Sequence, residues 1–408
     1  MEHAEITLLL LAAMGLLVPA GFALHASGAS RAKNAASALV RCIVQLAVAA
    51  LSFWAIGAAL MLGSGSAVIG FNARLLFIAG ADSRIFVSAI FFCLMLTLIA
   101  ASPIAAAMGE RSKTLPIWLA AGVLAAIVVP ICGYWTWTST GWLFRIGFID
   151  AGGASVLHLT GGLVAGVAAI CIGPRANKYN TDGSSNFIPG HSTPLAAAGL
   201  LLVAVGWFPY LIGAALLHGQ SAPRAAINLA LALAASTVVT YGMSRARYGK
   251  PDVLLTLSGM LAGLVSISAA PGAVNPIAAV AIGGIGGMLV LWGSVHLDMN
   301  WKIDDPSGAV APLVIGGAWA TLAAGIFTPH AGVGQRLKHI AIQSAGLIAI
   351  ALVAGGCAFA LFYVLKRISI LRISEAEEYD GIDLAEHDLN AYPDFQQTMI
   401  KSYHLREA

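Results

Sequence analysis

The stretch Asp150-Ala-Gly-Gly-Ala-Ser-Val-Leu-His158-Leu-Thr-Gly-Gly162 runs from a polar start straight into an apolar segment and carries one histidine with it. About 155 residues later, Asp305-Pro-Ser-Gly-Ala-Val-Ala-Pro-Leu313-Val-Ile-Gly-Gly317 repeats the aspartate and, at the same spacing, the glycine pair. When the two stretches are superposed, Asp150 falls on Asp305 and His158 falls on Leu313. The repeat predicts two related halves whose equivalent segments meet, with a histidine on one side of the meeting point and a leucine on the other.

The composition places the chain in a lipid bilayer. Of the 408 residues, 59% are hydrophobic and only 10% are charged, and the mean hydropathy is +0.84. These values exclude an ordinary soluble protein and predict a polytopic membrane protein. The net charge of +3 is spread over many short loops, so it does not favour a nucleic-acid partner.

The five cysteines stand singly within or beside apolar runs, without a Cys-x-x-Cys pair or a nearby histidine cluster. This pattern favours buried thiols over a disulfide or a metal site. No cofactor is expected. The cysteines are Cys42, Cys93, Cys132, Cys171 and Cys357.

Apolar runs of the length needed to cross a membrane, about 20 residues, predict eleven spans. They cover roughly 6–26, 38–62, 84–108, 116–136, 154–173, 193–217, 224–244, 252–270, 274–294, 308–328 and 340–365. The amino-terminal segment lacks the basic region of a cleaved signal peptide, so it is expected to remain as the first span. Basic residues such as Arg31, Arg111 and Arg175 follow the odd-numbered spans. The positive-inside rule then puts the carboxyl terminus in the cytoplasm and the amino terminus outside the inner (plasma) membrane.

Spans one to five and six to ten form equal sets that start from opposite sides of the membrane. The expected fold class is therefore an all-α polytopic membrane protein. It consists of an inverted five-helix repeat, with halves at about 1–175 and 190–330, and a long eleventh helix at about 340–365. In such folds the substrate path lies where the halves meet. Residues 371–408 form an acidic tail with too few large side chains for a core of its own, and both a docked regulatory tail and a partly disordered one fit this composition.

Further motifs follow one another along nearly the whole chain. They are Ala20-Gly-Phe-Ala-Leu24, Arg31-Ala-Lys-Asn34, Gly109-Glu-Arg111, Gly141-Trp142, Gly173-Pro-Arg175, His191-Ser-Thr-Pro194, Gly206-Trp-Phe208, Asp304-Asp305 and the tail pattern Leu371-Arg-Ile-Ser374 with Gly381-Ile-Asp-Leu-Ala-Glu-His387. In this order, and with the two stretches above, they resemble the ammonium transporter (Amt/Mep/Rh) family.

The resemblance implies a homotrimer in which each subunit has eleven spans and its own narrow pore for ammonium or ammonia. Residues 1–370 would form the transporter domain. Residues 371–408 would form a cytoplasmic regulatory tail that supports control by a PII-type signal protein.

The family's pore residues can be carried over one by one. Trp137 matches the tryptophan that receives ammonium by cation–π contact, and Ala214 stands where a serine usually helps it. Leu96 and Tyr210 stand where two phenylalanines gate the entrance. The paired pore histidines fall on His158 and Leu313, and Trp207 is assigned to the same pore.

The substitution at Leu313 bears directly on the transport chemistry. A bare cation at the membrane centre costs at least about 2.5–3.5 kcal/mol, and a pair of imidazoles resolves this by handling the proton separately, since their pKa lies near physiological pH. Leucine neither accepts nor donates a proton. The resemblance therefore implies ammonium transport with altered or reduced conduction or, alternatively, a non-conducting ammonium sensor that signals through its tail.

Other interpretations of these residues remain open. His158 could bond a neighbouring carbonyl, Trp137 could be an interfacial aromatic, and Asp150 is expected to order the start of a helix rather than to bind substrate. No catalytic or metal-binding constellation is found, so an enzyme is not expected. Solvated or interfacial positions are expected for His25, His191, His218, His296, His330 and His339.

Overall fold

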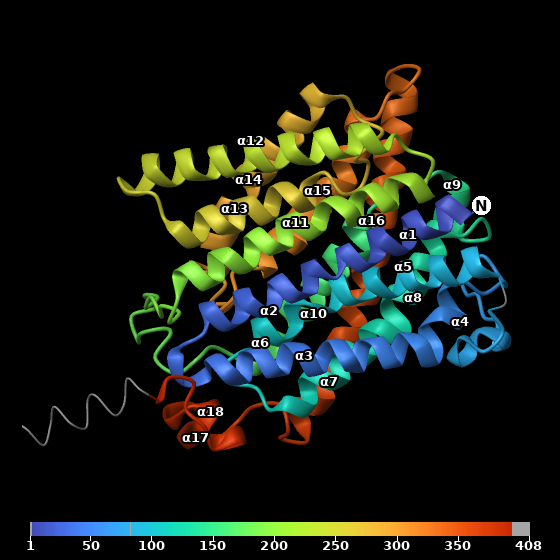
Figure 1. The fold of residues 1–408 in the computed structure, drawn as a ribbon. Helices are drawn as coiled ribbons and strands as arrows, with labels where there is room; N and C mark the ends of the chain where they lie inside the picture. Colours follow the sequence, from blue (N-terminus) through green and yellow to red (C-terminus); the bar gives the residue numbers. More distant parts are fainter. Residues whose placement is uncertain (1, 82, 394–408) are drawn as a thin grey trace, which may run out of the picture.

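The structure, a computed structural model, describes residues 2–81 and 83–393, which fold into a bundle of helices (Figure 1). In chain order the α-helices are α1 (Glu2–Gly15), α2 (Leu17–Ala29), α3 (Ala35–Ser52), α4 (Ala58–Met61), α5 (Arg84–Ala101), α6 (Pro103–Met108), α7 (Thr114–Val123), α8 (Val129–Trp137), α9 (Trp142–Ile146), α10 (Thr160–Ile172), α11 (Thr193–Leu217), α12 (Ala222–Tyr248), α13 (Val253–Ser266), α14 (Pro276–Met299), α15 (Val310–Phe327), α16 (Val333–Arg367), α17 (Glu375–Asp380) and α18 (Ile382–His387). Short 3₁₀ or π turns continue or join them: η1 (Ala32–Asn34), η2 (Phe53–Gly57), η3 (Ala73–Ile78), η4 (Leu124–Val128) and η5 (Ala154–Leu159).

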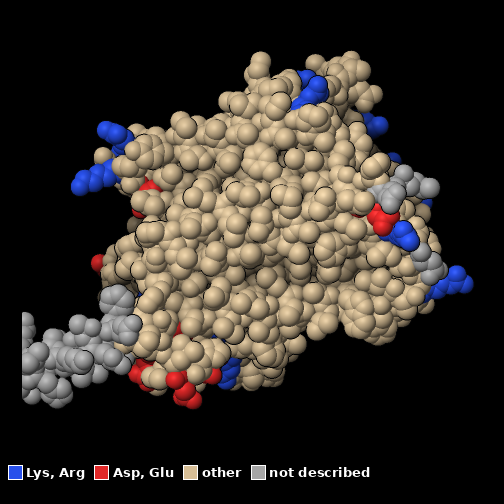
Figure 2. Space-filling view, viewed as in Figure 1, with Lys and Arg blue, Asp and Glu red and all other residues tan. Residues whose placement is uncertain are grey.

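The two ends of the bundle differ from its middle. Lys, Arg, Asp and Glu side chains gather at the ends, and the broad band between them is almost free of charge (Figure 2). Such a band matches the hydrocarbon core of a bilayer, where charged groups are costly. Residue 2 lies at one end, and the tail helices α17 and α18 pack at the other (Figure 1).

Ten helical segments of the described chain are long and apolar enough to cross a membrane. They correspond to ten of the eleven predicted spans, several of them built from two or more consecutive helices. The remaining predicted span, 252–270, is the shorter helix α13. The prediction of an all-helical polytopic membrane protein is thus confirmed.

Helix α13 ends earlier than its apolar sequence indicates. It starts where the Asp252 carboxylate accepts a hydrogen bond from the amide of Leu255 at 2.8 Å, and it runs for only 14 residues. Beyond it, the carbonyls of Ser268 and Ala269 accept the amides of Gly152 and Ala151 at 2.9 and 2.8 Å. Irregular backbone is tolerated at membrane depth where protein groups satisfy it, and here the partners are the residues that lead into η5.

Candidate functional site

A cavity of about 860 Å³ opens at the amino-terminal end of the bundle, and it is called here the N-side cavity. Four residues singled out from the sequence line it together: Leu96, Trp137, Asp150 and Ala214. The indole N–H of Trp137 donates to the Asp150 carbonyl at 2.8 Å, which fixes the orientation of the ring. The cavity thus presents an oriented aromatic ring among mainly apolar side chains, as cation–π recognition of a small cation requires.

Three further histidines line the N-side cavity. His218 lies beside Trp137, with 6.1 Å between ring centroids, and His330 stacks on His339 at 4.4 Å. Their positions at the ends of apolar segments follow from the sequence, but their convergence on one cavity does not.

Asp150 orders the entry into η5, the turn that carries His158. Its carboxylate accepts the amides of Ala154, Ser155 and Val156 at 2.5, 2.9 and 3.1 Å and the Ser155 hydroxyl at 2.6 Å. These donors are the otherwise unpaired amides of a helix start, so the arrangement is that of a capping carboxylate. With its acceptor positions used in this way, Asp150 is not available to bind a substrate cation.

Asp305 plays the same part in the second half. It accepts the Ser307 amide at 3.0 Å, the Ser307 hydroxyl at 2.6 Å and the Val310 amide at 2.8 Å, ahead of α15. The two aspartates that define the sequence repeat therefore share one local structure.

A buried triad of rings lies beyond the N-side cavity. The His158 imidazole stacks on Trp207, with centroids 4.7 Å apart and planes 22° apart, and its Nε2 lies 3.0 Å from the Tyr210 hydroxyl. The Tyr210 hydroxyl in turn donates to the Gly152 carbonyl. The indole of Trp207 donates to the Ser268 hydroxyl at 3.3 Å.

These contacts fix the tautomer of His158. The single hydroxyl proton of Tyr210 goes to the Gly152 carbonyl, because a carbonyl only accepts. The imidazole Nε2 must then donate to the Tyr210 oxygen, which leaves Nδ1 as an acceptor in the neutral ring. No residue in the described part of the chain gives this Nδ1 a hydrogen bond.

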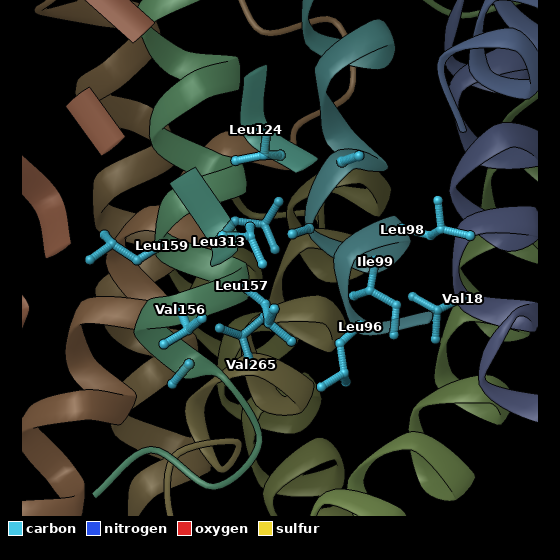
Figure 3. Close-up of a cluster of buried hydrophobic side chains, with 14 of the residues drawn as sticks. Val18, Leu96, Leu98, Ile99, Leu124, Val156, Leu157, Leu159, Val265 and Leu313 are labelled. Atoms are coloured by element: carbon cyan, nitrogen blue, oxygen red, sulfur yellow. The ribbon is translucent and has the colours of Figure 1, made fainter. Parts of the chain in front are cut away.

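Leu313 lies in an apolar environment. Figure 3 shows it in one cluster with Leu124, Leu157 and Leu159, all of them buried side chains. It packs against α10, where a Cβ on Gly162 would lie only 2.8 Å from the Leu313 Cβ. The two repeated stretches therefore meet, and Leu313 brings an apolar side chain to the place where they do.

One expectation about the histidines is wrong. His25 is only 3% exposed, whereas its place near the end of an apolar segment suggested a solvated or interfacial ring. Its partners are carbonyls of Ala196 and Ser307, 171 and 282 residues away in the chain. Nothing local in the sequence signals such contacts.

Comparison with known proteins identifies the family to which this architecture belongs. The family model described as Ammonium Transporter Family matches residues 6–392. The chain is 33% identical to the ammonium transporter Amt2 of Archaeoglobus fulgidus over 406 residues, which is 93% of this chain and 86% of that protein. The chain belongs to the ammonium transporter family.

Solved structures of similar shape agree with this assignment. A structure described as a Sensor Amt Protein superposes with a TM-score of 0.90 at 33% identity, covering 95% of this chain and 100% of that one. Mep2 of Candida albicans superposes with a TM-score of 0.81 at 22% identity, covering 92% of this chain and 87% of that one, and so supports the fold alone. The ammonium transporter family is a family of membrane transporters, not of enzymes, and ammonium is the substrate it implies.

Within the described residues, no group of three or more His, Cys, Asp or Glu side chains could hold a metal ion.

At the opposite end of this ammonium transporter fold, motifs from distant parts of the chain form one buried ion network. The Arg175 guanidinium bonds Asp304 at 2.9 Å and Glu110 at 3.1 Å, and Glu110 also pairs with Arg31. Arg111 donates to the Gly173 and Asp304 carbonyls, both at 2.7 Å. Burial alone would raise the pKa of Asp304, but the hydrogen bond from Arg175 and the charges of Arg111 and Arg175 outweigh it and lower that pKa to about 2.

The described part of the tail packs against this network. The Glu378 carboxylate accepts the Ala176 amide at 2.6 Å and pairs with Arg372 at 2.8 Å. Asp383 accepts the amides of Ala36 and Ser37 at 3.0 and 2.7 Å, at the start of α3. Residues 371–393 are thus docked on the bundle, while 394–408 lie outside the described residues.

Proposed function

We propose that this chain takes ammonium into the N-side cavity and passes it across the membrane, as ammonia, at a rate well below that of a family member with two pore histidines. The observation that carries the proposal is the closed contact between His158 and Tyr210, in a chain that has Leu313 at the second pore position. In this proposal, Trp137 in the cavity recognises ammonium, and the contact between His158 and Tyr210 slows its passage.

The missing second imidazole supports a reduced rate. An ammonium ion must lose its proton before it enters the apolar region, since a bare cation there costs at least about 2.5–3.5 kcal/mol. His158 can accept one proton through Nδ1, but Leu313 cannot take it further. One imidazole alone must therefore release this proton to the tail side before the next turnover, so the charge of the ammonium ion still crosses, but slowly.

Tyr210 adds a second resistance. In this proposal a molecule moving from the N-side cavity toward His158 passes Tyr210 and has to separate its hydroxyl from Gly152 and from Nε2. Each hydrogen bond contributes about 0.5–1.5 kcal/mol, and a buried group left unpaired costs about 1–3 kcal/mol. Breaking these hydrogen bonds of Tyr210 thus slows passage further.

A non-conducting ammonium sensor is the second candidate. The same closed contact favours it, and the tail is docked on loops that carry the ion network, so a change at the path has a route to the tail. The structurally similar protein named above is described as a Sensor Amt Protein. In this candidate, ammonium binds at Trp137 without crossing.

We further propose the assembly and orientation that the family suggests. In the most apolar stretches of helices α12 and α16, only 28% and 22% of the residues are buried inside the subunit. Much of the surface of these two helices is therefore free for lipid or for the other subunits of a homotrimer. The basic residues of the tail-side loops support a cytoplasmic tail and an outer N-side cavity in a plasma (inner) membrane. Residues 1–370 then form the transporter domain, and residues 371–408 form a regulatory tail open to a PII-type signal protein.

The test is an ammonium-pulse current from purified protein in liposomes. We compare wild type with His158→Ala, Leu313→His and Tyr210→Phe, and we measure ammonium binding to each by calorimetry. Transport predicts a small wild-type current that His158→Ala abolishes and that Tyr210→Phe and Leu313→His each increase.

The sensor candidate predicts a different pattern. Wild type would bind ammonium and carry no current, while Leu313→His together with Tyr210→Phe would restore one. A wild-type current as large as that of a two-histidine relative, measured in parallel, would refute reduced conduction. Absence of binding to wild type would refute both candidates.

A further inference from the structure

His25 is a buried histidine with an unusual set of partners. It lies where α2 meets α11 and the loop ahead of α15, and it is 3% exposed. Its Nδ1 is 3.0 Å from the Ala196 carbonyl, and its Nε2 is 2.7 Å from the Ser307 carbonyl. Both partners are acceptors only.

This geometry suits one charge state of the ring better than the other. A neutral imidazole has one N–H and one lone pair, so it can satisfy only one of the two carbonyls and turns its lone pair toward the other. The imidazolium has two N–H groups and donates to both. The contacts of His25 are therefore those of a protonated ring.

The surroundings of His25 place it next to a cavity at the tail-side end. It lines a chamber of about 90 Å³ together with Leu200, Ser258, Asp305 and Gly308. The last three also line a larger cavity of about 700 Å³, which opens at the end of the bundle where the tail packs. The chamber is thus the inner neighbour of that tail-side cavity.

The ionisable groups around His25 are few. From the α15 loop, Asp305 lines the same chamber, and Glu110 lines a small adjoining cavity with Ser307. The residues that α11 and α13 contribute to the chamber, such as Leu200 and Ser258, are uncharged. Among the residues that line the chamber with His25, Asp305 carries the one carboxylate.

We propose that protonated His25 is an electrostatic latch beside the tail-side cavity. It ties α2 to α11 and to the α15 loop, and its charge repels ammonium while a neutral molecule is not repelled. Loss of its proton removes one of the two bonds together with the repulsion. The proposal rests on the proposed function for its consequence in transport, but the charge and contacts of His25 are independent of it.

The first test is nitrogen-15 NMR of histidine-labelled protein in detergent micelles at pH 7. Imidazolium and neutral imidazole give distinct ring-nitrogen signals, and comparison with His25→Gln or His25→Asn assigns the signal of His25. His191→Gln, which removes a histidine that also bonds a carbonyl, serves as the matched control and should leave that signal in place. Two protonated nitrogens support the latch, and a neutral tautomer at pH 7 overturns it whether or not the protein conducts.

The second test uses the same variants in liposomes. With ammonium supplied on the tail side, where it meets His25 as the ion, removing the charge should raise the current of His25→Gln about tenfold over wild type, the equivalent of about 1.4 kcal/mol in barrier, while His191→Gln stays at the wild-type value. A current equal to wild type in a folded His25→Gln overturns the repulsion. Silence in every sample, Leu313→His included, refutes the proposed transport and leaves the NMR result to decide the charge of His25.

Discussion

Arg175 and Asp304 hold the two halves of the chain together through three hydrogen bonds of 2.9 Å. The Arg175 backbone amide and Nε donate to one carboxylate oxygen, and Nη2 donates to the other. The residues are 129 positions apart, and their side chains are 5% and 1% exposed. Because Asp304 directly precedes the capping Asp305, this ion pair also fixes the start of α15, the helix that carries Leu313.

We expect Asp304→Asn to destabilise the protein by about 3–5 kcal/mol, because breaking a buried pair leaves the Arg175 charge uncompensated. The midpoint of denaturant unfolding in detergent micelles measures the effect. Asp298→Asn is the matched control, since its pair with Lys178 at 3.0 Å is more open, with a carboxylate side chain 37% exposed. The control should lose less than about 1 kcal/mol, and equal losses in both variants would contradict the assignment.

The same pair predicts a pH dependence. The pKa of Asp304 is about 2 in the folded protein, against 3.8 ordinarily, because the Arg175 hydrogen bond and nearby charges outweigh burial. A lowered folded pKa gives stability that is complete above about pH 4 and is lost as the pH falls toward 2. Wild type should therefore lose roughly 2 kcal/mol of its advantage over Asp304→Asn between these values. A stability difference that stays constant down to pH 2 would rule out this linkage.

Local sequence signals predicted the elements that local physics determines. Asp150 and Asp305 were found from the sequence because a capping carboxylate acts within six residues of itself. The eleven apolar runs predicted the helices for the same reason, since length and hydropathy decide insertion. The end of α13 was missed, because it depends on carbonyls that pair with residues more than 100 positions earlier.

The arrangement of the site depends on contacts that the spacing of residues in the sequence does not reveal. The sequence placed His158 and Tyr210 as separate pore candidates, but only the fold shows the hydroxyl bridging Nε2 and the Gly152 carbonyl. His25 was expected to be solvated or interfacial for want of any local partner, whereas its two carbonyl partners come from α11 and from the loop ahead of α15.

The tail offers a prediction of its own. Asp383 is 1% exposed and accepts two amides at the start of α3, as an N-cap side chain does. We expect Asp383→Ala to cost about 1 kcal/mol of docking and so to raise the rate of limited proteolysis within 371–393 roughly fivefold. Glu375→Ala, at an exposed position in α17, is the control and should be cleaved at the wild-type rate. Unchanged cleavage of Asp383→Ala would show that other contacts hold the tail.

Gly317 in α15 lies where the two halves of the chain pack closely against each other. A Cβ at this position of α15 would lie 2.7 Å from the Ala154 carbonyl oxygen and 3.1 Å from the Leu159 amide, both of them backbone atoms of η5 that cannot rotate away. We expect Gly317→Ala to push η5 off α15 and to destabilise the protein by about 1–3 kcal/mol. Since η5 carries His158, the shift should also loosen the Tyr210 contact.

Gly355→Ala in α16 is the matched control for this substitution, because nothing lies within 4 Å of its added Cβ. It replaces glycine by the better helix former and should stabilise α16 by about 0.5–1 kcal/mol. Opposite signs for the two substitutions, measured as unfolding midpoints in the same detergent, are the expected result. A neutral Gly317→Ala would mean that the halves can separate at η5 without cost. The close contact would then not explain why the spacing from Asp305 to Gly317 repeats that from Asp150 to Gly162.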